Sequence, residues 1–163
     1  MVVDLRQLFE AVGKQIPIDY QLDLSDYEIN QGKPFVTPVS VTGTVQNIAG
    51  VVLLDYSVRC VMHLACDRCL AEFEREFTGR YQHTLVTELE SDSDEYTVVE
   101  DMLLDLDELV TLDVVLEYPT KVLCSPECKG LCAQCGADLN KGDCGCKQSK
   151  GDPRFDVLNQ LLT

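Results

Sequence analysis

The fold is decided by residues 51–86, which read VVLLDYSVRCVMHLACDRCLAEFEREFTGRYQHTLV. As far as Leu64, apolar side chains occupy every even-numbered position from Val52, and Asp55, Ser57, Arg59 and His63 lie between them. After Cys69 the alternation resumes on the odd-numbered positions and continues to Leu85. A period of two is typical of a strand that buries one face. We therefore expect a long β-hairpin with the turn CDRC, residues 66–69, at its tip.

Two further strands are expected before this hairpin. Residues 16–24 alternate between apolar and polar side chains, and residues 35–48 are rich in Thr and Val. Both features favour strands. A turn over residues 47–50 would join the second of these strands to the hairpin.

Three segments favour helices. Residues 3–12 carry apolar groups close to helical spacing. Residues 105–118 form a broad apolar face, and Asp105 with Glu108 makes a variant of the capping box at the start of this helix. The Asp-Pro pair at 152–153 would begin a short C-terminal helix.

Length and composition predict one domain with a small appended module. The chain has 163 residues, of which 45% are hydrophobic, enough to bury a core. No run approaches the roughly 18 apolar residues of a membrane span, and the first residues show no signal peptide. We therefore expect a cytoplasmic protein with no membrane contact, whose thiols are kept reduced.

The cysteines predict metal sites. Eight of the nine fall into four short pairs, which are Cys66 and Cys69, Cys124 and Cys128, Cys132 and Cys135, and Cys144 and Cys146. Residues 124–146 hold six of them in CSPECKGLCAQCGADLNKGDCGC, which offers few large apolar groups for a core. Eight thiolates match two tetrahedral four-cysteine sites. The ninth, Cys60, lies on the apolar face of the hairpin and is expected to be a small buried hydrophobe.

Two divisions of the eight cysteines are reasonable. We favour a compact ribbon site made of Cys132, Cys135, Cys144 and Cys146. The hairpin tip would then share the other site with the pair after the long helix, giving Cys66, Cys69, Cys124 and Cys128. The alternative joins the hairpin tip to the Cys132 pair and leaves the flanking cysteines together, which would interlace two sites in a tight loop.

The expected ligand is Zn²⁺, two ions with a structural role. A closed shell of four thiolates leaves no position for water, and the cysteine spacing does not follow the ferredoxin run of iron–sulfur proteins. A redox dithiol is the rival interpretation, but neither Cys-x2-Cys pair opens a helix within a βαβ unit. His63 and His83 are expected to be surface or packing residues. No phosphate loop or nucleophile motif points to an enzyme.

The charge is strongly acidic and uneven. The formal net charge is −15, and residues 81–120 hold twelve Asp and Glu and no Lys or Arg. Nucleic-acid binding depends mainly on Lys and Arg, so direct contact with RNA is not favoured by charge. A basic protein partner fits better. The plainer interpretation is that these acids form a solvated surface.

These features together predict an α+β protein. An antiparallel, barrel-like β-sheet with flanking helices and an acidic loop would occupy residues 1–120. Residues 121–163 would form a Cys-rich, zinc-binding segment, a zinc ribbon followed by the short C-terminal helix.

The chain resembles the YceD family, bacterial and plastid proteins associated with the accumulation of large ribosomal subunit RNA. The resemblance rests on CDRCL at 66–70, DLDELV at 105–110, CKGLCAQCGADLN at 128–140, CGC at 144–146 and DPRFDVL at 152–158. It implies a non-catalytic, cytoplasmic factor in large ribosomal subunit biogenesis. Members are commonly encoded beside a small basic protein of that subunit, which agrees with the acidic charge.

Three functions follow as hypotheses. In the first, the acidic surface holds a basic ribosomal protein or ribosome assembly factor. In the second, the chain is a zinc-ribbon RNA-binding protein that contacts phosphates through Lys129, Lys141, Lys147 and Lys150. In the third, it is a thiol redox protein that uses one Cys-x2-Cys pair.

Overall fold

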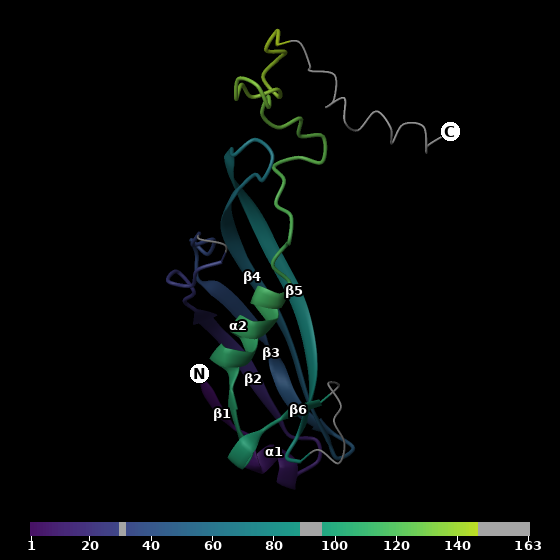
Figure 1. Ribbon diagram of the computed structural model, residues 1–163. Coiled ribbons are helices and arrows are strands. Elements are labelled where there is room, and N and C mark those ends of the chain that lie inside the picture. The colour runs from purple at the N-terminus through teal and green to yellow at the C-terminus, as the bar shows by residue number, and fades with distance from the viewer. Residues whose placement is uncertain (30–31, 89–95, 147–163) are drawn as a thin grey trace, which may run out of the picture.

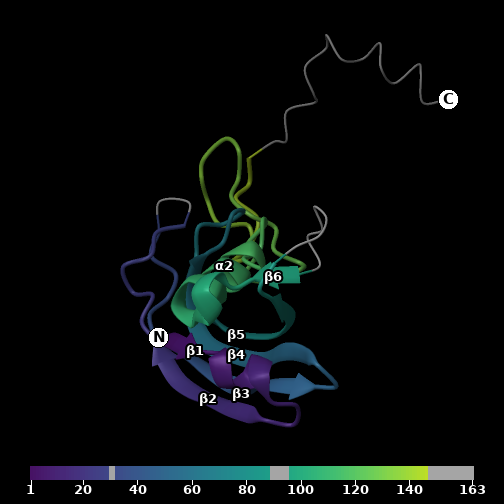
Figure 2. The same ribbon diagram turned by 90° about the horizontal axis from the view of Figure 1, so that it is seen from below.

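A computed structural model of the chain describes residues 1–29, 32–88 and 96–146. Its main sheet has five strands, β2 (Gln15–Leu22), β3 (Val39–Ile48), β4 (Val51–Ala65), β5 (Glu72–Val86) and β6 (Tyr96–Val98). They lie in that order, and the first four are antiparallel to their neighbours. The sheet curls into an open half-barrel (Figure 1, Figure 2). The predicted α+β class with a barrel-like sheet is confirmed, although the edge strand β6 runs parallel to β5.

The remaining elements come before β2 or after β6 in the chain. They are β1 (Val2–Asp4), α1 (Arg6–Glu10), the 3₁₀ turn η1 (Glu100–Met102), β7 (Leu103–Asp105) and α2 (Leu106–Leu116). β1 and β7 form a second, two-stranded antiparallel sheet.

The predicted helix over residues 3–12 is wrong in its first part. Val3 is buried and pairs with Leu104 of β7, so the chain is extended there and becomes helical only from Arg6. Pairing with a strand about a hundred residues away has overridden the local helical spacing, because burial and ladder hydrogen bonds outweigh a weak propensity. Residues 152–163, where the short C-terminal helix was predicted, lie outside the described residues.

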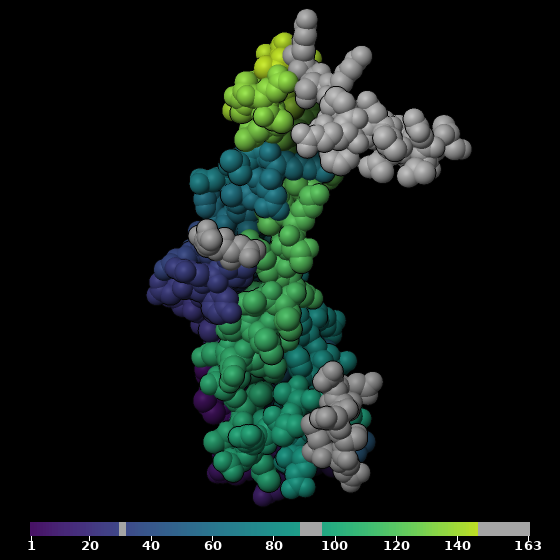
Figure 3. Space-filling model, in the orientation of Figure 1, coloured from purple at the N-terminus to yellow at the C-terminus, as the bar shows by residue number. Residues whose placement is uncertain are grey.

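β4 and β5 form the long hairpin expected from the sequence. They pair from Val52 with Leu85 to Ala65 with Glu72. Every even-numbered side chain of β4 from Val52 to Leu64 is at most 4% exposed, as the alternation predicted. Because the hairpin reaches beyond the other strands, its tip stands away from the rest of the sheet, and residues 121–146 run beside it and past it (Figure 1, Figure 3).

The turn between β3 and β4 is hydrogen-bonded to helix α1. Ala49 and Gly50 both have positive φ, which suits a two-residue hairpin turn. Asn47, a buried polar residue, accepts a hydrogen bond from the Gly50 N–H at 2.9 Å and donates one to the carbonyl oxygen of Leu8 at 2.6 Å. The turn thereby fixes α1 against the sheet.

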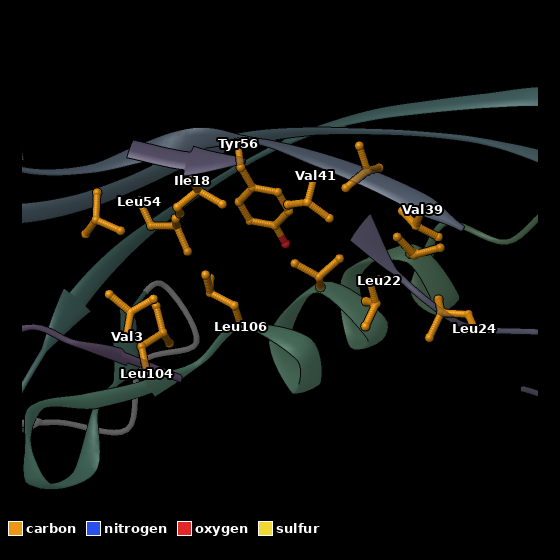
Figure 4. Packing of buried hydrophobic residues seen from close by; sticks show 14 of the residues in the cluster. Val3, Ile18, Leu22, Leu24, Val39, Val41, Leu54, Tyr56, Leu104 and Leu106 are labelled. Atoms are coloured by element: carbon orange, nitrogen blue, oxygen red, sulfur yellow. The ribbon is translucent and has the colours of Figure 1, made fainter. Parts of the chain in front are cut away.

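Helix α2 covers the inner face of the sheet. Asp105 caps it by accepting a hydrogen bond from the Asp107 N–H at 3.0 Å, in agreement with the predicted start. Leu106, Val110 and Val114 are wholly buried and share one face at a spacing of four residues. Figure 4 shows the Tyr56 hydroxyl pointing from the sheet toward this helix.

A partly buried polar network fastens α2 to the strands. The Asp113 carboxylate accepts a hydrogen bond from the Tyr56 hydroxyl and lies 2.7 Å from Nε2 of His83. Nδ1 of His83 lies 3.3 Å from Oγ1 of Thr97 on β6. Burial, followed by the bond to Asp113, raises the pKa of Tyr56 well above its ordinary value. His83 therefore serves packing, as expected, and links α2 to β5 and β6.

Candidate metal centres

The structure gathers the eight paired cysteines into two tetrads. The first tetrad is Cys66, Cys69, Cys124 and Cys128, and the second is Cys132, Cys135, Cys144 and Cys146. Within each, the four sulfur atoms all lie within 4.8 Å of one another. This is the division that the spacing favoured; the interlaced alternative is not what the fold brings together.

The sulfur separations match a shared metal and not a disulfide. In the first tetrad, the Sγ atoms of Cys66 and Cys128 are 3.8 Å apart, and those of Cys69 and Cys124 are 3.7 Å apart. A disulfide bond is about 2.05 Å long. Four sulfurs placed tetrahedrally around zinc at about 2.3 Å would be separated by about 3.8 Å. The tetrads could therefore hold metal ions without rearrangement of the chain.

Two turns of the same design supply half of each tetrad. In the CDRC turn, the Cys66 N–H donates to the Ala71 carbonyl oxygen and the Leu70 N–H donates to the Cys66 carbonyl oxygen, both at 2.9 Å. In the CAQC turn, the same two bonds join Cys132 with residues 137 and 136, both at 2.8 Å. The residue after the second cysteine has positive φ in both turns, Leu70 at 59° and Gly136 at 73°. We call these the hairpin knuckle (residues 66–71) and the ribbon knuckle (residues 132–137).

Residues 121–131 lie along the hairpin knuckle, and their backbone N–H and C=O groups form hydrogen bonds with it. The Asp67 N–H donates to the Val122 carbonyl oxygen at 2.8 Å, and the Val122 N–H donates to the Asp67 carboxylate at 2.6 Å. The Leu131 N–H donates to the carbonyl oxygen of Arg68 at 3.1 Å. Gly130 lies so close that a Cβ there would stand 3.0 Å from that same oxygen. This strapping brings the second half of the first tetrad to the hairpin tip.

Two arginines of the hairpin also bind residues 121–131, which we call the strap. Nη1 of Arg68 donates to the Cys128 carbonyl oxygen at 2.8 Å, and Nη2 of Arg75 donates to the Leu123 carbonyl oxygen at 2.6 Å. The Arg75 guanidinium also lies over the ring of Phe73, 5.2 Å from its centre. From the sequence, Arg68 is a candidate donor to the thiolates or contact for a partner; the structure instead has it bound to a carbonyl oxygen. Sequence reasoning did not single out Arg75.

Asn140 links the two tetrads. Its Nδ2 donates to Sγ of Cys128 at 3.4 Å, and its Oδ1 accepts from the Lys129 N–H at 2.8 Å. Asn140 follows the ribbon knuckle in sequence, yet its side chain serves a cysteine of the first tetrad. Sequence reasoning did not identify this role; its position in the CKGLCAQCGADLN run was the one available signal.

Backbone N–H groups favour the thiolate form of one cysteine in each tetrad. The N–H of Cys124, followed by other backbone donors, lowers the pKa of Cys66 to about 6. The N–H groups of Cys135 and Gln134 lower the pKa of Cys132 to about 6. A charged sulfur held in place by peptide N–H groups is the form that binds a metal.

One sulfur in each tetrad holds its proton much more tightly. Burial and the Cys69 thiol raise the pKa of Cys124 to about 12, and the thiols of Cys135 and Cys144 raise the pKa of Cys146 to about 12. Four sulfurs this close cannot all carry negative charge unless a cation lies among them. Metal binding at either tetrad would therefore release protons.

The two tetrads differ in how deeply their cysteines are buried. Cys66, Cys69 and Cys128 are buried and pack against Phe73, Leu123 and Leu131, while Cys124 is exposed. In the second tetrad Cys135 is exposed and the other three cysteines are partly buried.

Cys60 belongs to neither tetrad. It is buried in the main core, and burial raises the pKa of its thiol to about 11. The interpretation of Cys60 as a small core hydrophobe is confirmed. His63 lies near Glu72, with Nε2 3.7 Å from its carboxylate, and is not a member of either tetrad.

Comparison with known proteins places this geometry in a family. The family described as large ribosomal RNA subunit accumulation protein YceD matches residues 54–162, which include nearly all of the hairpin and both tetrads. The chain belongs to the YceD family. Among the described residues, no helix is long and apolar enough to cross a membrane.

Similar proteins come from bacteria and a plant. The uncharacterized protein YlbN of Bacillus subtilis is 26% identical over 160 residues, which cover 96% of this chain and 93% of the relative. The uncharacterized protein Rv2926c of Mycobacterium tuberculosis is 31% identical over 127 residues, 72% of this chain and 59% of the relative.

A third relative carries a functional name. The large ribosomal RNA subunit accumulation protein YCED homolog 1, chloroplastic, of Arabidopsis thaliana is 26% identical over 170 residues, which cover 85% of this chain and 51% of the relative. This chain thus spans little more than half of the mycobacterial and plant proteins. No solved structure matches it significantly.

Proposed function

We propose that this chain is a non-catalytic factor in large ribosomal subunit biogenesis, which supports rRNA accumulation by holding a basic ribosomal or assembly protein on its acidic surface. The role in rRNA accumulation rests on the family and on the name of the plant relative. The kind of partner rests on one observation, the absence of Lys and Arg from residues 81–120, which hold twelve acids. We place the activity in the cytoplasm.

The acids of this stretch gather around α2. Glu100 and Asp101 lie on η1, just before β7, and Glu108 and Glu117 lie at the two ends of α2; all four are exposed. Acids at a helix N-terminus are stabilised by the helix dipole. The C-terminal Glu117 has no such support, and its carboxylate instead accepts a hydrogen bond from the Tyr81 hydroxyl at 2.8 Å. A concentration of acids beyond what the fold needs favours a role in attracting positive charge.

The metal in this proposal is Zn²⁺, one ion in each tetrad. Sulfur separations of 3.7 and 3.8 Å support it in the first tetrad, and the four sulfurs of the second also lie within 4.8 Å of one another. A shell of four thiolates leaves no coordination position for a substrate. The ions would be structural, fixing residues 121–146 to the hairpin. Each such site carries a net charge of about −2, which adds to the acidity of the chain.

Capture from cells at two salt concentrations tests the partner. Tagged chain is used to isolate bound proteins at low and at high salt, and the proteins are identified by mass spectrometry. We expect ribosomal or assembly proteins of basic charge at low salt and their release at high salt, because exposed charge pairs are screened. Absence of any such protein at low salt contradicts the proposal.

Direct binding of rRNA is a second candidate. One observation favours it, because residues 121–154 carry six Lys and Arg against four acids. Of the lysines proposed to contact phosphates, Lys141 has its Nζ 3.7 Å from the Asp138 carboxylate. Lys147 and Lys150 lie outside the described residues. Filter binding with a structured rRNA fragment separates the two: binding with a steep salt slope supports RNA contact, and no binding supports the protein partner.

A thiol redox activity remains the third candidate and predicts a metal-free dithiol. Each Cys-x2-Cys pair lies beside two further sulfurs, which supports metal binding instead. Metal analysis of freshly purified protein decides between them. We expect about two zinc ions per chain and no iron.

A further inference from the structure

Helix α2 has two apolar faces, and only one of them is used by the fold. Leu106, Val110 and Val114 pack on the sheet. On the opposite side, Leu112 is 54% exposed and Leu116 is 73% exposed. These two leucines are four residues apart and therefore lie one above the other on the helix. A helix with one packed face normally carries polar residues on the other.

The outer face of α2 lies open at the surface. Figure 3 shows the helix on the side of the molecule turned toward the viewer. Beside Leu112 there is a hollow of about 410 Å³, also lined by Tyr27, Asp107 and Glu108. Tyr27 is itself 38% exposed. The described residues thus present an apolar stripe next to a shallow hollow that could receive a side chain.

Acids flank this stripe at both ends. Glu108 precedes Leu112 by one turn, and Glu117, whose carboxylate also accepts a hydrogen bond from the Tyr81 hydroxyl of β5 at 2.8 Å, follows Leu116. From Glu108 to Glu117 the helix rises about 14 Å, roughly the length of two and a half turns of a second helix. An occupant that complements this surface carries apolar side chains along its middle and Lys or Arg around them.

Other occupants fit less well. A second copy of this chain placed across a twofold axis would set the acids of one α2 against those of the other. Anionic lipid and RNA would be repelled by the same charges. A basic amphipathic helix satisfies both the leucines and the acids, in the manner of helices that bind apolar grooves with charged rims.

We propose that the outer face of α2, centred on Leu112 and Leu116, is a docking site for a basic amphipathic helix of a partner protein. This inference rests on the proposed function, because it names the part of the acidic surface that such a partner contacts. Leucine burial supplies the affinity, and the exposed Glu108 sets the orientation by pairing with a basic side chain.

Binding of a designed peptide tests the site on the full-length, zinc-loaded protein. The probe is a fluorescent synthetic helix with Leu on one face and Lys on the other, and the control peptide has the same composition in scrambled order. We expect the ordered probe to bind more tightly than the scrambled one. The double variant Leu112→Ser/Leu116→Ser should weaken binding of the ordered probe by about tenfold or more, since two buried leucines are lost.

A matched variant guards against a general loss of apolar surface. Ile48 and Val51, at the β3–β4 turn, are 50% and 47% exposed, so Ile48→Ser/Val51→Ser removes similar exposed area far from α2. It should leave probe binding unchanged. Zinc content and melting temperature, measured for every variant, establish that the fold is intact.

Three outcomes would overturn the inference. Equal binding of both peptides, unaffected by the leucine changes, would mean that charge alone is responsible. Tighter probe binding by a full-length Phe155→Ser/Leu158→Ser/Leu161→Ser variant would mean that the chain's own C-terminal segment occupies the face. A basic ribosomal protein captured equally by wild type and Leu112→Ser/Leu116→Ser would place the contact elsewhere, while leaving the proposed function intact; the proposed function fails separately if wild type captures none.

Discussion

The two tetrads have the same ligands and the same kind of knuckle, but they are built into the protein differently. The first joins segments 55 or more residues apart, such as Cys69 and Cys124, and buries three of its four cysteines. The second closes within 15 residues, between Cys132 and Cys146, and remains partly exposed. Closing the longer loop removes more entropy from the unfolded chain, and its packing is shared with the hairpin. The comparison assigns the first tetrad to the stability of the whole fold and the second to local order.

Removal of one ligand from each tetrad should give the largest contrast. Cys128→Ser should lose one of two zinc ions, release residues 121–131 from the hairpin, and lower the melting temperature by roughly 10 °C. Cys135→Ser should also lose one zinc ion, but the melting temperature of the β domain should change little. Zinc analysis and calorimetry measure both effects. Equal losses of melting temperature would show that the two tetrads form one cooperative unit.

Much of this arrangement could be predicted from the sequence, because it depends on local patterns. The hairpin follows from alternation around Cys66 and Cys69, and the division of the cysteines follows from their spacing. What could not be predicted depends on contacts between distant segments. The pairing of Val3 with Leu104 makes part of a helical pattern into a strand. The parallel edge strand β6 has only three residues, too few for an alternating pattern to predict it.

The candidate site shows the same limit. Its ligands stand out because cysteine pairs are rare and their spacing is short. The residues that support them are ordinary polar side chains. The only signal for Asn140 is its place in the CKGLCAQCGADLN run, which does not say that its side chain reaches Cys128. Asp67 binds Val122 across 55 residues. Such contacts become visible only when the hairpin tip and the strap are placed together.

Chelation should separate the tetrads by rate. We expect release of zinc to a chelator in two phases, with the faster phase from the exposed second tetrad, about tenfold or more ahead of the first. The Cys135→Ser variant, which keeps only the first tetrad, should show the slow phase alone. Cys128→Ser should show the fast phase alone. A single phase for the wild-type protein, or the reverse assignment, contradicts the difference in burial as its cause.

Asn140 tests whether the tetrads are independent. Asn140→Ala removes the donor to Cys128, so it should weaken zinc binding at the first tetrad by about tenfold, although the residue lies between the two halves of the second. Competition with a zinc indicator measures this effect in a Cys135→Ser background. Lys141→Ala is the neighbouring control, since its side chain is 85% exposed and should leave that affinity unchanged. An unchanged affinity in Asn140→Ala would make the 3.4 Å contact incidental.

The smallest expected effect concerns the two knuckles themselves. Leu70 and Gly136 occupy equivalent left-handed positions, where a side chain with a Cβ is strained and glycine is not. Leu70 is 68% exposed, so Leu70→Gly gives up little packing and should stabilise the protein by about 0.5 kcal/mol, the relief of strain exceeding the added freedom of the unfolded chain. Gly136→Ala should instead cost about 1 kcal/mol, confined to the ribbon knuckle. Denaturant titration measures the effect of Leu70→Gly. Hydrogen exchange of the backbone amides around residue 136 measures the effect of Gly136→Ala. If Leu70→Gly destabilises the protein, the Leu70 side chain contributes contacts that outweigh its backbone strain, and the two knuckles differ in more than burial.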